Sequence, residues 1–195
     1  SLKPKANQMN LRDHILSEAA KIIKAQGYAG ATMRDIAEAV GVEVSSLYNH
    51  ISSKQEILSS ICFSIGQEYI EGLTILLNNK LSYKKQLKGI IHLHVDLAAK
   101  HQASMQVFEE EWKHLKDGEM EHFKEMRQNY ENKLLVFFQQ GIESRKFKSI
   151  DQKVLLYHFL SSLKWLNFYF KENKTLDIDL LKKQLNQLIC NGLIL

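Results

Sequence analysis

Proline is almost absent from this chain, and its scarcity constrains the fold more than any other feature of the sequence. Average usage of about 5% would give roughly ten prolines at this length, but the 195 residues include one, Pro4, which precedes every periodic segment. Apolar residues recur at spacings of three and four along stretches rich in Leu, Lys, Glu, Gln and Ile, which favour helices. The sequence therefore predicts an all-α protein of about nine helices.

Composition narrows the class of protein further. Hydrophobic residues make up 45% and charged residues 25% of the chain, which excludes a disordered chain. No apolar run approaches the roughly 20 residues that span a bilayer, and the segment SLKPKANQMN lacks an apolar signal core. We therefore expect a cytoplasmic protein that does not enter a membrane. Cys62 and Cys190 lie far apart and outside any metal-ligand spacing, so we expect buried free thiols and no cofactor.

The first sixty residues carry the most informative pattern. Gly27 closes a first helix, and Thr32 and Asp35 have the spacing of a capping box at the start of a short second helix that ends at Gly41. Residues 45–50 form a third. Two short helices joined by a tight glycine-containing turn predict a helix-turn-helix, whose second helix can enter a DNA major groove. An ordinary αα-corner with a solvated polar face is the alternative, and the net charge of +4 is too small to decide between them.

The segment ATMRDIAEAVGVEVSSLYNHISSKQEIL resembles the DNA-binding signature of the TetR family of transcriptional regulators. The shared features are a threonine-capped helix with Asp-Ile-Ala, a Gly-Val pair, Leu-Tyr-Asn-His, and a lysine that opens the fourth helix, while Ile51 replaces the usual phenylalanine. The resemblance implies a helix-turn-helix DNA-binding domain over residues 1–53 and an effector-binding and dimerisation domain over residues 54–195. It also implies double-stranded operator DNA as a partner.

The resemblance distributes candidate DNA contacts over nine positions. Three would contact phosphates: Tyr48, His50 and Lys54. Thr32 would cap its helix and offer a phosphate its hydroxyl or backbone N–H. The candidates for groove readout are Arg34, Val44, Ser45, Ser46 and Asn49. A basic arm made of Lys3, Lys5 and Arg12 would track the DNA backbone, although an untethered terminus is the simpler interpretation.

The rest of the chain is expected to form further helices over residues 54–79, 83–101, 103–115, 118–145, 151–172 and 178–193. Glu111-x-x-His114 and Glu119-x-x-His122 have the ligand spacing of di-iron bundles. Because the two motifs lie close together in one strongly polar stretch, we expect solvated or partly buried histidines there and no metal site. No glycine-rich phosphate loop, nucleophile elbow or Cys/His pairing indicates an enzyme.

In the TetR family the centre of the second domain holds an effector pocket. The aromatic and Met stripes here are by themselves typical of plain core, so polar and aromatic residues embedded in them are the candidate ligand contacts: His94, Arg127, Asn129, Tyr130, His158 and Trp165. The runs MRQNYENKLLVFFQQGIESRKF and LKWLNFYF are also similar to a TetR subgroup that answers to acyl-CoA thioesters. This similarity implies a small, mostly apolar effector, with Arg127 as the partner of its phosphate or carboxylate.

The last two helices are expected to form a dimer interface. Their candidate interface residues are Leu155, Phe159, Ser162, Leu166, Leu181, Leu185, Leu188 and Gly192. Paired with their symmetry mates they would give an isologous four-helix bundle. The sequence thus predicts a homodimeric transcriptional repressor that a small effector releases from a palindromic operator. The alternative is a helical enzyme or lipid-binding protein with a vestigial helix-turn-helix.

Overall fold

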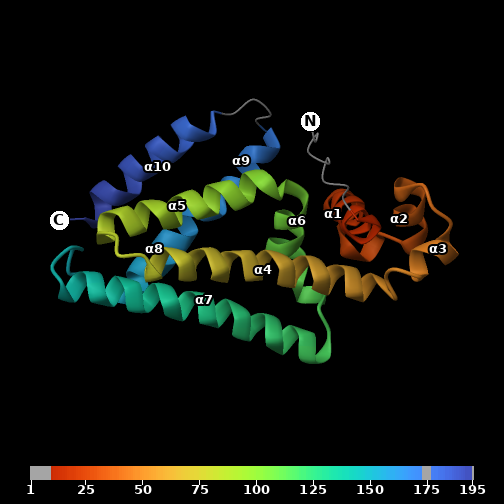
Figure 1. The fold of residues 1–195 in the computed structure, drawn as a ribbon, viewed down its shortest axis with the longest axis horizontal. Coiled ribbons are helices and arrows are strands. Elements are labelled where there is room, and N and C mark those ends of the chain that lie inside the picture. Colours follow the sequence, from red (N-terminus) through yellow and green to blue (C-terminus); the bar gives the residue numbers. More distant parts are fainter. Residues whose placement is uncertain (1–9, 173–176, 195) are drawn as a thin grey trace, which may run out of the picture.

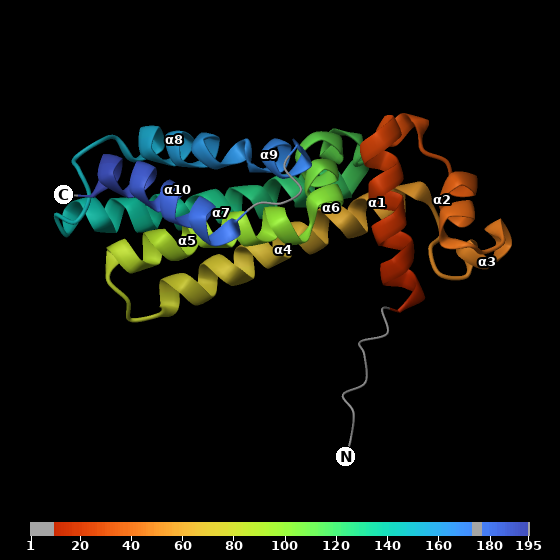
Figure 2. The same cartoon turned by 90° about the horizontal axis from the view of Figure 1, so that it is seen from above.

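The computed structural model describes residues 10–172 and 177–194, which form helices and connecting loops with a single isolated β-bridge between Phe147 and Ile194. Three helices lie at one end: α1 (Leu11–Gly30), α2 (Met33–Val40) and α3 (Val44–Tyr48). The long α4 (Lys54–Asn78) leads away from them into a bundle (Figures 1 and 2). That bundle contains α5 (Tyr83–Lys100), α6 (Gln102–Gln106), α7 (Asp117–Glu143), α8 (Gln152–Lys164), α9 (Leu166–Glu172) and α10 (Ile178–Leu193). The all-α prediction is confirmed.

Local signals set the boundaries of the first helices. Gly27 has φ 74°, so the regular part of α1 ends where the sequence places its end. The Thr32 hydroxyl accepts a hydrogen bond from the Asp35 N–H, and the Asp35 carboxylate accepts one from the Thr32 N–H, which completes the capping box of α2. Gly41, at φ 77°, makes the left-handed turn that leads into α3.

Two expected helices are interrupted. Residues 103–115 form α6, then a π-helical turn η1 (Val107–Glu111), then a 3₁₀ turn η2 (Trp112–His114). The expected helix over residues 151–172 breaks at Trp165 into α8 and α9. The Trp165 indole N–H donates to the Ser162 carbonyl at 2.6 Å. In an unbroken helix this carbonyl would instead accept from the backbone N–H of residue 166. Counting each interrupted helix once, the described residues agree with nine helices.

Two buried clusters dominate the interior. The larger lies in the bundle far from α1–α3, among α4, α5, α7, α8, α9 and α10. The other, which we call the shared core, joins residues of α1, α2 and the start of α4 to Val107, Leu115 and Phe123 of the second half. The packing of α1–α3 is therefore completed by residues from far along the chain. The predicted boundary between residues 53 and 54 stays a prediction.

The apolar residues expected at a dimer interface lie mostly inside the protomer. Leu155, Phe159, Leu166, Leu181 and Leu185 are buried in the larger cluster, so assigning them to an interface was wrong. Amphipathic spacing marks the face of a helix that needs cover, but that cover here comes from the same chain. Ser162 is half-buried, whereas Leu188 and Gly192 are exposed.

Within the described residues, none of the helices combines the length and apolar character needed to cross a membrane. The same residues hold no grouping of three His, Cys, Asp or Glu side chains suited to a metal ion. Instead, the Glu111 and His114 side chains contact each other at 3.3 Å.

Candidate DNA-binding surface and effector pocket

Most candidate DNA contacts lie on the surface of α2 and α3. Arg34, Ser45, Tyr48, Asn49 and His50 are exposed, and the side chains at positions 44 and 46 are half-buried. The fully buried Leu47 fastens the short α3 from its inner side. Since α3 spans only five residues, its orientation depends on this anchor and on the helices around it.

Lys54 and Thr32 are engaged within the protein. The Lys54 ammonium donates to the carbonyl oxygens of Tyr28 at 2.7 Å and Ala31 at 2.8 Å, and it lies 4.6 Å from the centroid of the Tyr28 ring. These contacts tie the start of α4 to the end of α1. The Thr32 hydroxyl donates to the Asp35 carboxylate at 2.7 Å as part of the capping box. Both residues hold the module together in addition to any contact with DNA.

Arg12 does not belong to a free basic arm. Its guanidinium donates to the Glu56 carboxylate at 2.8 Å, to the Ser60 hydroxyl at 3.0 Å and to the His50 carbonyl at 3.0 Å. Hydrogen bonds from the Ser52 side chain and backbone, joined by the one from Arg12, lower the pKa of Glu56 to about 2. Arg12 therefore braces α1 against α4 and the end of α3. Lys3 and Lys5 lie outside the described residues.

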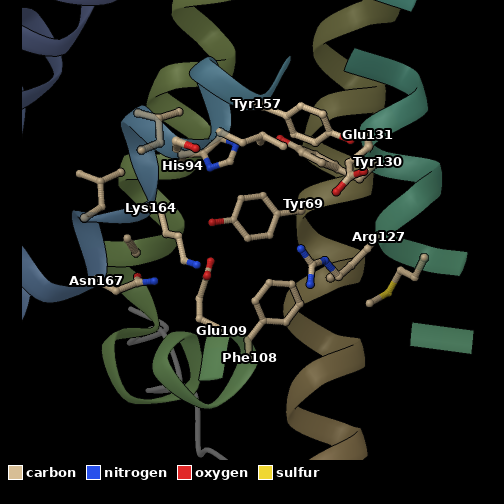
Figure 3. Close-up of a pocket in the computed structure, with 17 residues that line it drawn as sticks. Tyr69, His94, Phe108, Glu109, Arg127, Tyr130, Glu131, Tyr157, Lys164 and Asn167 are labelled. Atoms are coloured by element: carbon tan, nitrogen blue, oxygen red, sulfur yellow. The ribbon is translucent and has the colours of Figure 1, made fainter. Parts of the chain in front are cut away.

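A cavity of about 280 Å³ opens among α4, α5, α7, α8 and η1. Tyr69, His94 and Tyr130 form its aromatic floor (Figure 3). The His94 Nε2 and Tyr130 hydroxyl are hydrogen-bonded at 2.8 Å, and the Tyr69 and His94 rings lie 4.8 Å apart. Desolvation lowers the pKa of His94 to about 3, so this imidazole is neutral at physiological pH. The floor thus offers ring faces and polar tips without a charge.

Another part of the cavity lining, which we call its wall, is charged. Arg127 of α7, Lys164 of α8 and Glu109 of η1 all point into it (Figure 3). Burial raises the pKa of Glu109, although the charges of Lys164 and Arg127 oppose this rise. The Asn167 Oδ1 is buried and has no hydrogen-bond partner among the described residues. An amphiphilic molecule would therefore meet an aromatic floor and a wall that presents both donors and acceptors.

Some of the predicted ligand contacts line this cavity and others do not. His94, Arg127 and Tyr130 line it. His158 and Trp165 do not, because α8 turns a different side, formed by Tyr157, Ser161 and Lys164, toward the cavity. His158 and Trp165 are exposed, as is Asn129.

Several cavity residues were not among the candidates: Tyr69, Phe108, Glu109, Glu131, Tyr157, Lys164 and Asn167. The spacing of Tyr157, Ser161 and Lys164, four and then three residues, was the available signal on α8. No pattern in the sequence marks Glu109, because it enters the cavity through the irregular turn η1.

Comparison with known proteins identifies the family. Residues 15–61 match the family described as "Bacterial regulatory proteins, tetR family", and residues 80–193 match "Tetracyclin repressor-like, C-terminal domain". The transcriptional repressor KstR2 of Mycolicibacterium smegmatis is 23% identical over 184 residues, which cover 93% of this chain and 90% of that protein.

Solved structures share the fold over nearly the whole chain. The ketosteroid transcriptional regulator KstR2 of Mycobacterium tuberculosis superposes with a TM-score of 0.89 at 19% identity, covering 97% of this chain and 98% of that one. AibR in complex with isovaleryl coenzyme A and operator DNA gives a TM-score of 0.80 at 20% identity, covering 92% and 97%. The chain therefore belongs to the TetR family of bacterial regulatory proteins, and it is a DNA-binding transcriptional repressor, not an enzyme.

Proposed function

We propose that this repressor reads a palindromic operator as a homodimer and is released by a small amphiphilic effector with an acidic group. The observation that carries the effector class is the pairing of an aromatic floor with Arg127 and Lys164 in one cavity. Because its ligand is chromosomal DNA, the protein acts in the bacterial cytoplasm.

The exposed side chains of α3 and of the two residues that follow it read the DNA. Ser45 and Asn49 are compact and polar, as base-edge contacts require, and Tyr48 and His50 lie beside them to contact phosphates. Arg34 reaches the same groove from α2. Thr32 can still offer a phosphate its hydroxyl while it caps α2, and Lys54 acts mainly by holding α4 against α1. Val44 and Ser46 contribute shape and a short hydroxyl at the start of α3.

The effector places its apolar part against Tyr69, His94 and Tyr130 and its acidic group beside Arg127 and Lys164. A volume of about 280 Å³ lies just below the usual range for ligand pockets in proteins, about 300–1,000 Å³. A short acyl group fits this size better than a long chain. The AibR complex, which holds isovaleryl coenzyme A, supports an acyl-CoA-like effector for this chain as well.

Exposed apolar residues on α8, α9 and α10, and at the break between α8 and α9, support the homodimer. They are Val154, Trp165, Phe168, Leu180 and Leu188, of which Leu188 is 73% exposed. His158 follows Val154 by four residues and therefore lies on the same side of α8. This surface, defined by these six residues, is the proposed dimer face, and it replaces the buried leucines as the site of contact between the two copies.

The effector acts through the spacing of the two reading helices, which are the α3 helices of the two copies in the dimer. These must lie about 34–36 Å apart, or a multiple of it, to read successive half-sites. Both Gly66 and Tyr69 of α4 line the cavity, while the first residue of α4, Lys54, holds the end of α1. A tenfold loss of operator affinity needs a coupling free energy of about 1.4 kcal/mol between the two ligands.

The test has two parts. Selection from a random DNA pool should yield a palindrome. Ser45→Ala or Asn49→Ala should alter which bases are preferred, with a change of about 1–3 kcal/mol in the binding free energy that discriminates the contacted base from the others. Ser64→Ala, an exposed serine on α4, is the matched control. Calorimetry with isovaleryl coenzyme A should then give a lower affinity in the presence of saturating operator. Failure to select any sequence at low salt would contradict DNA reading, and equal effector affinities would contradict release by this effector.

A further inference from the structure

One carboxylate in the effector pocket has a place that the proposed function does not explain. Glu109 lies at the wall of the cavity that also presents Lys164 and Arg127 (Figure 3). Burial of a carboxylate is costly unless opposite charges compensate it, and these two cations act on Glu109 in that sense. Without an effector, Glu109 is a cavity carboxylate on which the charges of both Lys164 and Arg127 act.

An acidic effector would seek the same two cations. An effector anion beside Lys164 and Arg127 would compete with the Glu109 carboxylate for the same two cations, and its like charge would favour protonation of Glu109 or its movement away from them. In either case the attraction that draws Glu109 toward the cations is weakened.

Glu109 lies on a segment that also touches the DNA-binding module. The π-helical turn η1 includes Phe108 and Glu109, which line the cavity, and Glu111, whose carboxylate accepts a hydrogen bond from the Tyr28 N–H at 3.3 Å. The His114 ring stacks on the Tyr28 ring at 5.2 Å. Single π-helical turns occur often at functional sites, and their hydrogen-bond register differs from that of the adjoining α-helix.

Tyr28 is in turn fastened to the start of α4. Its carbonyl oxygen accepts from the Lys54 ammonium at 2.7 Å, and its hydroxyl donates to the Gln55 side chain at 2.9 Å. The Gln55 amide also donates to the His114 carbonyl at 3.3 Å. A displacement of η1 would therefore reach α1 and α4 together, at the joint that orients α2 and α3.

We propose that Glu109 is an internal counterion that stands in for the effector anion and keeps η1 in the conformation that holds Tyr28 for DNA binding. Displacement of Glu109 by the effector shifts η1, and the contacts of Glu111 and His114 with Tyr28 pass this shift to the reading helices. Glu109 is thus a positioning residue, and this inference rests on the proposed function.

The experiment compares Glu109→Gln with Glu131→Gln. The second glutamate also lines the cavity but lies on α7, outside η1. In the absence of any effector, E109Q should weaken binding to the selected operator at least threefold, because the charge that holds η1 toward the cations is gone. E131Q should bind like the original protein. Lys164→Met removes the other partner of the same interaction. Because the two substitutions break one shared interaction, the double variant E109Q/K164M should bind the operator no more weakly than the single variant that binds it less tightly.

A spectroscopic readout reports on η1 itself. The chain has two tryptophans, of which Trp112 directly follows η1 and Trp165 lies between α8 and α9. With both tryptophans kept, E109Q should change the tryptophan emission and E131Q should not. If a palindrome is selected but E109Q binds it like the original protein with unchanged tryptophan emission, the counterion role is wrong and the proposed function stands. If no sequence is selected, the proposed function itself fails, while the emission change still tests the pairing of Glu109 with the cations.

Discussion

At the scale of single residues, replacing Lys54 distinguishes a structural role of its side chain from a role in contacting DNA. Its ammonium is held by the Tyr28 and Ala31 carbonyls and the Tyr28 ring. We expect Lys54→Ala to lower the free energy of unfolding and to weaken binding to all DNA sequences alike, with little change in the salt dependence of binding. Affinity measured across a salt series checks this, because loss of a phosphate contact would lower the salt slope by about 1.

The control for Lys54 is Lys21→Ala, which removes an exposed lysine of α1 whose ammonium pairs with Glu18 within the same helix. It should leave operator affinity and stability nearly unchanged. A fall of the salt slope by about 1 for Lys54→Ala would assign this lysine to a phosphate after all.

Side-chain roles were predictable from the sequence only where the role is local or the polarity unusual. His94, Arg127 and Tyr130 stand out because they interrupt apolar stripes, and all three line the cavity. Glu109 and Lys164 do not stand out, since charged residues at helical spacing normally face solvent. Their convergence depends on how η1 meets α8, which no short-range pattern encodes.

At the scale of helices, the cap of α2 gives a direct prediction. The Thr32 hydroxyl accepts from the Asp35 N–H at 3.1 Å and donates to the Asp35 carboxylate at 2.7 Å. Thr32→Ala should lower the free energy of unfolding by about 1 kcal/mol, the usual cost of losing an N-cap. Urea unfolding followed by circular dichroism measures this change. Thr32→Ser keeps the hydroxyl and should recover most of the loss, whereas equal stability of the alanine variant would mean that the box contributes nothing.

The reliability of prediction differs between helix ends and helix interruptions. Capping boxes and glycine turns were found because their partners lie within a few residues of each other. The π-helical turn at Val107–Glu111 and the break at Trp165 were missed. At the break the Trp165 indole N–H donates to a helix carbonyl in place of a backbone N–H. Helix propensities take no account of such competition for a backbone acceptor.

At the scale of the whole molecule, the dimer face can be tested without harming the core. Leu188→Glu places a charge on a side chain that is 73% exposed in the single chain, so the fold should persist. In a dimer the same charge would be buried without a partner, at a cost of several kcal/mol. Sedimentation should show monomers, and operator affinity should collapse because one half-site offers too few contacts.

Ile75→Glu on α4 is the matched control, since Ile75 is also an exposed apolar residue, at 64%, outside the proposed dimer face. It should stay dimeric. A dimeric Leu188→Glu variant would place the interface elsewhere. The correction of this face has a simple cause: periodicity shows that a helix side is covered, but it does not say whether the same chain or a second copy covers it.

The shared core bears on how new regulators of this kind can arise. Val107, Leu115 and Phe123 complete the packing around α1, α2 and the start of α4. The DNA-binding helices therefore cannot be transferred to another protein without part of their core. A chimaera that joins residues 1–53 to the sensor of a distant relative would leave fully buried side chains such as Ile15 and Ile36 against foreign partners. New operator preferences should therefore evolve by substitution on the exposed side of α3, and new inducers by substitution in the cavity, rather than by exchange of whole modules.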